Sequence, residues 1–238
     1  MPKSFIKIKP VTSYSEDHNY RVVRPKYLIE PMERNFNAKH STIAEKRTFL
    51  EKLVKEKTGR KMQKKATPIR EAVVLLPDDD NQVNIKALNS LTDRLYKRFK
   101  IKTFQMHIHN DEGHFDENGV GKYNYHAHLL FDWVDHDTGK SLKLTPEDMS
   151  EIQTITAEVL SMERGLKGSK NLSLNHNEYR GYLAMKDNLE KKLKAEISEK
   201  NKEDIRKEII AKRDANKRRN TEKKEPGTKK PNQRGFKR

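Results

Sequence analysis

The sequence contains no cysteine among its 238 residues. Without thiols, disulfide scaffolds, cysteine-ligated zinc, iron–sulfur clusters and thiol catalysis are all excluded. It also lacks any run of about 18 apolar residues, the length that a membrane-spanning helix needs. Residues 1–10 lack the apolar segment of a secretory signal. We therefore expect a cytoplasmic protein with no membrane partner.

Acidic side chains are outnumbered in this chain. There are 35 Asp and Glu against 51 Lys and Arg, which gives a net charge of +16. Such an excess of positive charge favours a polyanionic partner, above all nucleic acid. A basic surface that only faces solvent is the alternative, and charge alone does not decide between the two.

The positive charge is concentrated toward the C-terminus, where residues 201–238 carry a net charge of +9. We expect a globular domain over residues 1–186, a charged helical extension over 187–212 and a basic, disordered tail over 213–238. A tail of this kind can hold DNA phosphates without reading the base sequence.

Apolar periodicity predicts strands and helices that alternate along the domain. Strands are expected over residues 4–9, 71–76, 102–109 and 125–133, and helices over 41–59, 82–99, 145–162 and 177–212. Thr42 and Glu45 have the spacing of a capping box, and Thr145 before Pro146 marks another helix start. Residues 10–40 and 110–124 are interpreted as loops. This order is typical of an α+β fold, an antiparallel sheet flanked by helices.

Five of the nine histidines lie between residues 107 and 128. Because side chains alternate along a strand, His107 and His109 share one face of their strand, and His126 and His128 share one face of theirs. If the two strands pair, three imidazoles can converge on one metal ion. Three protein ligands with open positions indicate a catalytic site, and a polar strand face without metal is the alternative.

The same strands carry an apolar row on their other face, which includes Phe104, Met106 and Ile108. Asp111 and Glu112 follow directly after His109, where a carboxylate can orient a ligand imidazole or complete the coordination of the metal. Imidazole ligands suit manganese, zinc and related metals, whereas magnesium prefers oxygen. His114 lies in the following loop, where we expect it to face solvent.

Short motifs in this chain resemble those of a known family. His126-Ala127-His128 is similar to the His-hydrophobic-His strand of HUH single-strand endonucleases. His109-Asn110-Asp111-Glu112 resembles half of the third motif of MobV (Mob/Pre) relaxases, and His18-Asn19-Tyr20-Arg21 fits their His-Asn-x-Arg motif. The resemblance covers roughly residues 1–185. One departure is that residues 113–125 separate Glu112 from His126, where the family has a compact His-x-Asp-Glu-x-x-Pro-His-x-His motif.

The resemblance implies a sheet of about five strands and a bacterial plasmid- or transposon-mobilisation function. Such relaxases nick one strand at an origin of transfer, stay attached to its 5′ end and later rejoin it. The metal ligands would be His109, His126 and His128, with His107 or His114 as alternatives to His109 because of the long loop. The metal would be Mn²⁺ before Mg²⁺ or another transition metal. Glu112 would assist at the metal, His18 would be the nucleophile, and Arg21 would bind the scissile phosphate.

A tyrosine is the alternative nucleophile, because Tyr14, Tyr20 and Tyr27 lie close to His18 in the sequence. Cations interleaved with aromatic rings suit single-stranded DNA. We expect the DNA contacts to come from Asn19, Arg24, Lys26, Lys167, Lys170 and Arg180. The partners would be the single-stranded nick region, the flanking origin hairpin and the coupling machinery of conjugation.

Three other functions stay open on the sequence. A rolling-circle replication initiator of the same superfamily would nick a replication origin instead. A non-catalytic DNA-binding protein would hold its metal in a closed four-ligand site and would keep binding DNA without His18. A metal-free RNA-binding protein would take up no metal.

Overall fold

The structure is a computed structural model that describes residues 2–25, 27–29, 34–116, 118–169 and 176–222. The chain divides into two compact units, Met1–Ser169 and Lys170–Arg238. The first unit ends before the boundary expected at residue 186. In the part of the chain that the structure describes, no helix is long and apolar enough to cross a membrane.

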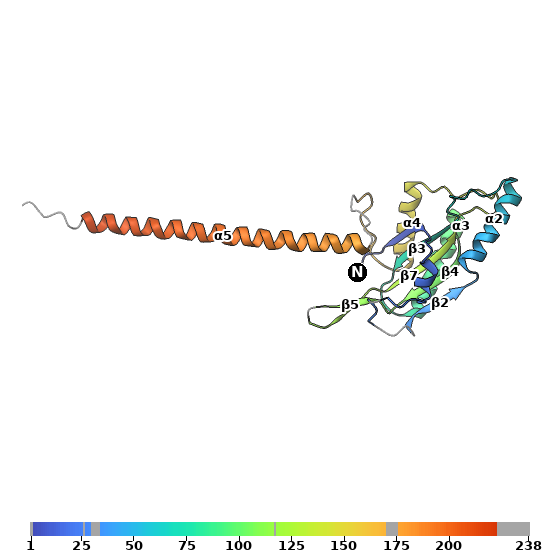
Figure 1. Ribbon diagram of the computed structural model, residues 1–238, viewed down its shortest axis with the longest axis horizontal. Coiled ribbons are helices and arrows are strands. Elements are labelled where there is room, and N and C mark those ends of the chain that lie inside the picture. Colours follow the sequence, from blue (N-terminus) through green and yellow to red (C-terminus); the bar gives the residue numbers. More distant parts are fainter. Residues whose placement is uncertain (1, 26, 30–33, 117, 170–175, 223–238) are drawn as a thin grey trace, which may run out of the picture. The chain divides into compact units, whose positions relative to one another are not determined.

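Five strands of the first unit form one antiparallel sheet in the order β1-β3-β7-β4-β2. They are β1 (Ile6–Pro10), β2 (Phe36–Lys39), β3 (Ile69–Leu75), β4 (Lys102–His109) and β7 (His126–Asp132) (Figure 1). The central strand β7 is buried along its whole length. This sheet confirms the expected α+β fold with about five strands.

Helices cover both faces of the sheet. On one face, α3 (Asn81–Phe99) and α4 (Pro146–Val159) bury their apolar sides in the main core. That core includes Leu88, Leu91 and Leu95 from α3, Ile152 and Ile155 from α4, and Val74, Ile108 and Leu129 from the sheet. On the other face, α2 (Ile43–Thr58) packs Leu50 against Leu130 of β7. The histidines therefore lie on the α2 side, beyond the end of that smaller cluster.

The helix ends follow the expected capping chemistry. Thr42 and Glu45 form a complete capping box at α2, and Gly59 ends that helix in the left-handed region with φ of 71°. Thr145 and Asp148 form a second capping box at α4, which has Pro146 at its first position. These contacts satisfy backbone groups that a helix end otherwise leaves without partners. Both predicted starts are confirmed.

One predicted side-chain orientation on β4 is wrong. Met106 and Ile108 lie in the main core as expected, but Phe104 packs with Leu50 and Leu130 in the cluster under α2. The register of β4 with β7 shifts between Thr103 and Gln105, which is a β-bulge. Because a bulge inserts one extra residue, it reverses the alternation of side chains before it.

Both segments interpreted as loops contain short elements. Residues 10–40 hold α1 (Ser15–Asn19) and β2, and residues 110–124 hold a hairpin of β5 (Gly113–Phe115) and β6 (Gly121–Tyr123). These elements are three to five residues long. Stretches of this length are too short to establish a 3.6-residue or two-residue period.

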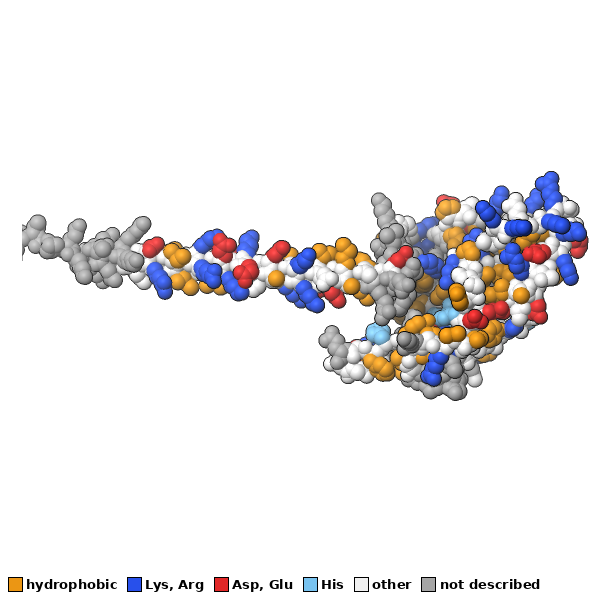
Figure 2. All heavy atoms as spheres, viewed as in Figure 1, with side chains coloured by type: hydrophobic (Ala, Val, Ile, Leu, Met, Phe, Trp, Pro, Cys, Tyr) orange, Lys and Arg blue, Asp and Glu red, His pale blue; other side chains and the backbone are white. Residues whose placement is uncertain are grey.

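The second unit contains a 47-residue helix, α5 (His176–Glu222). The helix continues past residue 212 because residues 213–222 contain neither proline nor glycine. Its described side chains, 178 and 181–216, are exposed. Ion pairs one turn apart support it, such as Glu208 with Lys212 at 2.8 Å. Figure 2 shows cationic, anionic and hydrophobic side chains interleaved along the helix. Residues 223–238 of the expected tail lie outside the described residues.

Candidate metal centre

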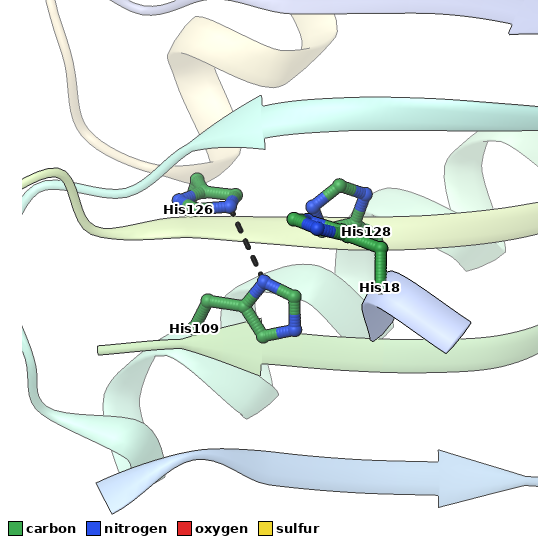
Figure 3. Close-up of side chains that lie close together, drawn as sticks. All are labelled: His18, His109, His126 and His128. Carbon is green, nitrogen blue, oxygen red and sulfur yellow. Dashed lines mark hydrogen bonds between the residues drawn. The ribbon is translucent and has the colours of Figure 1, made fainter. Parts of the chain in front are cut away.

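Pairing of β4 with β7 brings the predicted histidines together. His109 lies opposite His126, and His107 lies opposite His128. The short helix α1 places His18 beside them, so that ligand nitrogens of His18, His109, His126 and His128 all lie within 4.8 Å of one another. Figure 3 shows the four rings, which come from α1, β4 and β7.

Hydrogen bonds to the backbone fix which nitrogen carries the proton on two of these rings. His109 Nε2 lies 3.1 Å from the carbonyl oxygen of Asn19, and His126 Nδ1 lies 2.7 Å from that of Asn124. A carbonyl oxygen only accepts, so both of these nitrogens must donate. The remaining nitrogens, His109 Nδ1 and His126 Nε2, face each other at 3.3 Å with lone pairs. Two neutral rings in these tautomers cannot satisfy each other, whereas a shared cation satisfies both.

His128 supplies a third inward lone pair. Its Nδ1 lies 2.9 Å from Glu71 Oε1 and donates to that carboxylate, while its buried Nε2 has no hydrogen-bond partner among the described residues. Asn19 Nδ2 and Ser15 Oγ hold Glu71 in place at 3.0 and 3.2 Å. A carboxylate behind an imidazole orients the ring and strengthens it as a metal ligand. Glu71 was not among the predicted site residues, although a lone carboxylate in an apolar strand was a signal for it.

Burial favours the neutral form of three of these histidines. It lowers the pKa of both His109 and His128, and the neighbouring imidazoles lower it further. Burial also lowers the pKa of His18, although Glu112 opposes that shift. A neutral imidazole has a lone pair, which it needs both as a metal ligand and as a nucleophile. The lowered pKa values of His18, His109 and His128 therefore favour the form that either role requires.

Arg21 is the centre of an ionic cluster beside the histidines. Its guanidinium donates to Asp111 at 2.6 and 3.0 Å and to Glu112 Oε1 at 2.7 Å. Although burial acts to raise it, hydrogen bonds from Arg21 and Asn35 hold the pKa of Asp111 below its ordinary value. Glu112 Oε1 also lies 3.7 Å from His18 and 3.8 Å from both His109 and His126. The ionic cluster thus holds the Glu112 carboxylate next to the inward lone pairs of His109 and His126.

The residues expected to contact DNA differ in how exposed they are. Arg24 and Lys167 are exposed, whereas Asn19 is 1% exposed and acts as a support for Glu71 and His109. Arg21, expected on a phosphate, is buried against two carboxylates. Lys26, Lys170 and the side chain of Arg180 lie outside the described residues.

The alternative ligands and nucleophiles lie elsewhere. His107 pairs with Asn37 and Gln105, and burial lowers its pKa to about 4. His114 is exposed on β5. Tyr14 and Tyr27 are 75% and 43% exposed, while the ring of Tyr20 lies 4.6 Å from that of His107. His18 has a ligand nitrogen within 4.8 Å of those of His109, His126 and His128.

The donor set fits a divalent transition metal. Three buried imidazoles present lone pairs toward one point, and a carboxylate oxygen lies 3.8 Å from two of them. Nitrogen donors of this kind suit Mn²⁺, Co²⁺, Ni²⁺ or Zn²⁺ better than Mg²⁺. His109, His126 and His128 would hold such an ion, with Glu112 beside it.

Comparison with known proteins identifies the fold. The structure is similar to the MobM relaxase domain (MOBV; Mob_Pre) in a Mn-bound crystal structure with 22 nt of plasmid pMV158 oriT DNA carrying a 3′ thiophosphate. The TM-score is 0.59 at 15% sequence identity, over 76% of this chain and 98% of that one. A Mn-bound structure of the same domain with 23 nt of oriT DNA gives a TM-score of 0.55 at 16% identity, with the same two coverages. This chain therefore has the fold of a relaxase domain. No family model and no curated protein matches the sequence.

Proposed function

We propose that this chain is a relaxase of the MobV (Mob/Pre) family. It would nick one DNA strand at a plasmid or transposon origin of transfer, with help from a divalent metal, in the bacterial cytoplasm. The observation that carries the proposal is the set of three inward imidazole lone pairs with His18 beside them. The similar MobM domain is described as Mn-bound and bound to oriT DNA, which supports both the metal and the partner.

The proposed chemistry is a transesterification. A bound divalent ion would supply positive charge near a phosphate oxygen, an effect worth several kcal/mol. Neutral His18 attacks the phosphorus, so that an N–P bond forms and the P–O3′ bond breaks. The departing 3′ oxygen takes up a proton, the imidazolium formed on His18 gives up the proton of its other ring nitrogen, and the 5′ phosphate stays on His18. Reversal of the step rejoins the strand without ATP, because the N–P bond conserves the energy of the ester.

Glu112 and Arg21 support this chemistry from beside the histidines. Arg21 Nη1 lies 3.3 Å from the carbonyl oxygen of His18 and 3.5 Å from its Nδ1. A donor at Nδ1 places the proton of neutral His18 on Nε2, so Nδ1 is the ring nitrogen whose lone pair would attack. Since the guanidinium is also paired with Asp111 and Glu112, we propose that Arg21 positions His18 and both carboxylates. Exposed cations such as Arg24 and Lys167 are the proposed backbone contacts, and the coupling machinery is a proposed partner.

Oligonucleotide cleavage tests the proposal. Single-stranded oligonucleotides that tile the transfer origin of the protein's own plasmid or transposon are labelled at the 3′ end and incubated with Mn²⁺ or with chelator. We expect a Mn²⁺-dependent nick that leaves protein on the labelled fragment. An acid-labile adduct indicates His18, and an acid-stable one indicates a tyrosine. Cleavage of replication-origin oligonucleotides instead would favour a replication initiator. If neither set is cleaved, both the relaxase and the initiator functions are overturned.

A second candidate function follows from the position of His18 itself. Because its ligand atom lies within the four-histidine group, the site could also close around a metal with four imidazoles, as in a non-catalytic DNA-binding protein. His18 is 30% exposed, whereas the side chains of His109, His126 and His128 are at most 6% exposed. This difference favours an open site in which His18 stays available.

The variant His18→Ala separates the two candidates. In an open three-histidine site, it binds Mn²⁺ with the wild-type stoichiometry and within about threefold of the wild-type affinity, but it forms no adduct with DNA. In a closed site, it loses metal binding by tenfold or more, because one of four ligands is gone. Isothermal titration with MnCl₂ measures the first quantity, and the denaturing gel measures the second.

A further inference from the structure

The hairpin of β5 and β6 is a part of the molecule that the proposed chemistry does not use. It occupies the stretch between Glu112 and His126, both of which belong to the candidate site, and it projects from the five-stranded sheet (Figure 1). At full extension, the three residues from Glu112 to Phe115 span at most about 11 Å. Anything bound on the hairpin therefore lies close to the histidines.

The root of the hairpin is tied to the same segments that build the site. Gly113 N donates to the carbonyl of Tyr27 at 3.3 Å, and Ile29 N donates to that of Asp111 at 2.9 Å. Asn124 N donates to the carbonyl of Glu112 at 3.0 Å. The hairpin is thus held in a defined position relative to the carboxylates.

The two faces of the hairpin differ in chemistry. Gly113 pairs with Tyr123, and Phe115 pairs with Gly121, so this face carries two aromatic rings, each opposite a glycine. His114 and Lys122 are paired on the other face. Phe115 is 61% exposed and Tyr123 is 38% exposed. Figure 2 shows hydrophobic side chains on this projection.

The ring of Tyr123 continues an aromatic stack that begins at the core. Tyr125 packs against the main core, and the ring of Tyr123 lies parallel to it, with 5.4 Å between centroids and 4° between planes. Parallel offset stacking is the arrangement that flat π-systems prefer. Because every nucleobase has a π-face, exposed rings of this kind serve as stacking platforms for unpaired bases in proteins that bind single-stranded DNA.

We propose that the Phe115 and Tyr123 face of the hairpin stacks an unpaired base of the DNA strand, within a few nucleotides of the phosphate at the histidines. The identity of the nucleic acid rests on the proposed function, while the stacking site rests on the hairpin geometry. Continuity of the hairpin with the candidate site favours DNA over a protein partner for this exposed face. Lys122 on the opposite face, 3.5 Å from Asp116, adds a cation to the hairpin.

Binding of a fluorescent oligonucleotide tests this proposal without cleavage. The full chain is titrated in chelator with single-stranded DNA that carries one 2-aminopurine, moved base by base through the region around the nick. We expect strong quenching at one or two positions, because stacking on an aromatic ring quenches this base. Tyr123→Ala and Phe115→Ala should each remove the quenching and raise the Kd roughly tenfold, since one stacked base is worth about 1–3 kcal/mol.

Two variants make the test specific. Tyr123→Phe keeps the ring and should bind within twofold of wild type. Tyr96→Ala removes an aromatic ring of similar exposure, 49%, from α3 and should change neither the Kd nor the quenching. Circular dichroism confirms that all variants fold, which is expected for exposed positions.

The outcomes distinguish this proposal from the proposed function. Suppose that wild type nicks DNA, but that Tyr123→Ala and Phe115→Ala bind the oligonucleotide and quench its fluorescence as wild type does. The hairpin proposal is then overturned, and the proposed relaxase function is kept. If wild type quenches the fluorescence and the two alanine variants do not, but wild type nicks no DNA, the hairpin proposal is supported and the proposed relaxase function is overturned. Binding of no single-stranded DNA by the wild-type chain would overturn both.

Discussion

The orientation of His128 depends on a single carboxylate, Glu71, which is 2% exposed and accepts a hydrogen bond from His128 Nδ1 at 2.9 Å. Without this acceptor, the ring can rotate or change tautomer, and its inward Nε2 lone pair is no longer fixed. One residue outside the proposed ligand set therefore controls the orientation of a proposed ligand.

We predict that Glu71→Gln weakens Mn²⁺ binding by 10- to 100-fold, the range typical for partners of metal-bound histidines. Glutamine keeps the size of the side chain but replaces the charged acceptor with a neutral one. Isothermal titration with MnCl₂ measures the change. The control is Glu51→Gln, an exposed carboxylate on α2 whose side chain is 50% exposed, which should bind as wild type does. Equal affinity in both variants would contradict the role of Glu71.

Individual residues also mark the limit of what the sequence could predict. Strand alternation predicted that His107 and His109 share one face of their strand and that His126 and His128 share one face of theirs, while the choice of His109, His126 and His128 as ligands came from the resemblance to MobV relaxases. The pairing of Glu71 with His128 was not predictable, because it depends on the register of β3 against β7, which the sequence pattern leaves open. The orientation of Phe104 depends on a β-bulge, which cannot be recognised from the alternation of polar and apolar residues in the sequence.

At the scale of elements, the capping boxes make a local stability prediction. Thr42→Ala removes the side chain that accepts from Glu45 N at 3.1 Å and should destabilise the protein by about 1 kcal/mol at neutral pH. Thr48→Ala, within the same helix, should stay within about 0.5 kcal/mol of wild type. Urea denaturation measures both differences, and equal losses would contradict the capping contribution.

The same capping box gives a pH dependence. Hydrogen bonds from the Thr42 backbone and side chain hold the pKa of Glu45 below its ordinary value of 4.5. A lowered carboxyl pKa stabilises the fold above 4.5, and this contribution disappears as pH falls through the folded-state pKa. The difference between wild type and Thr42→Ala should therefore shrink below pH 4.5. A difference that stays constant down to pH 3 would show that Glu45 contributes nothing.

The hairpin of β5 and β6 needs glycine at its first position. A Cβ on Gly113 would lie 2.4 Å from the carbonyl oxygen of Lys122 and 2.7 Å from Ile29 Cδ1. We predict that Gly113→Ala costs about 1–3 kcal/mol of unfolding free energy, because backbone must move to make room. Gly165→Ala, where nothing lies within 4 Å, should stay within about 0.5 kcal/mol of wild type. Thermal and urea unfolding compare the two variants.

At the scale of the whole molecule, metal binding should stabilise the folded state. An ion that binds only the folded chain adds about 2.7 kcal/mol when its concentration is 100 times the Kd. We predict that MnCl₂ raises the melting temperature, that chelator reverses the rise and that His128→Ala abolishes it. The exposed His114→Ala should keep the full rise. If MnCl₂ raised the melting temperature of His128→Ala as much as that of wild type, the metal would bind at a different site.

The sheet order explains why the overall architecture was easier to predict than the site. Patterns within single segments predict the helices, the strands and the helix caps. The antiparallel pairing of β4 with β7 follows from two such strands joined by one loop. The site instead combines α1, β3, β4 and β7, and the contributions of α1 and β3 depend on contacts between segments far apart in the sequence. The hairpin was interpreted as a loop because its strands are three residues each.

The central position of β7 has a consequence for native-state hydrogen exchange. Its amides bond to β3 on one side and β4 on the other, and every residue of the strand is buried. Amides in such a strand exchange with solvent deuterium only when the whole unit opens. His126 and His128 therefore lie in the slowest-exchanging part of the chain. We therefore expect the strand that carries two of the proposed ligands to keep its place whether or not a metal ion is bound.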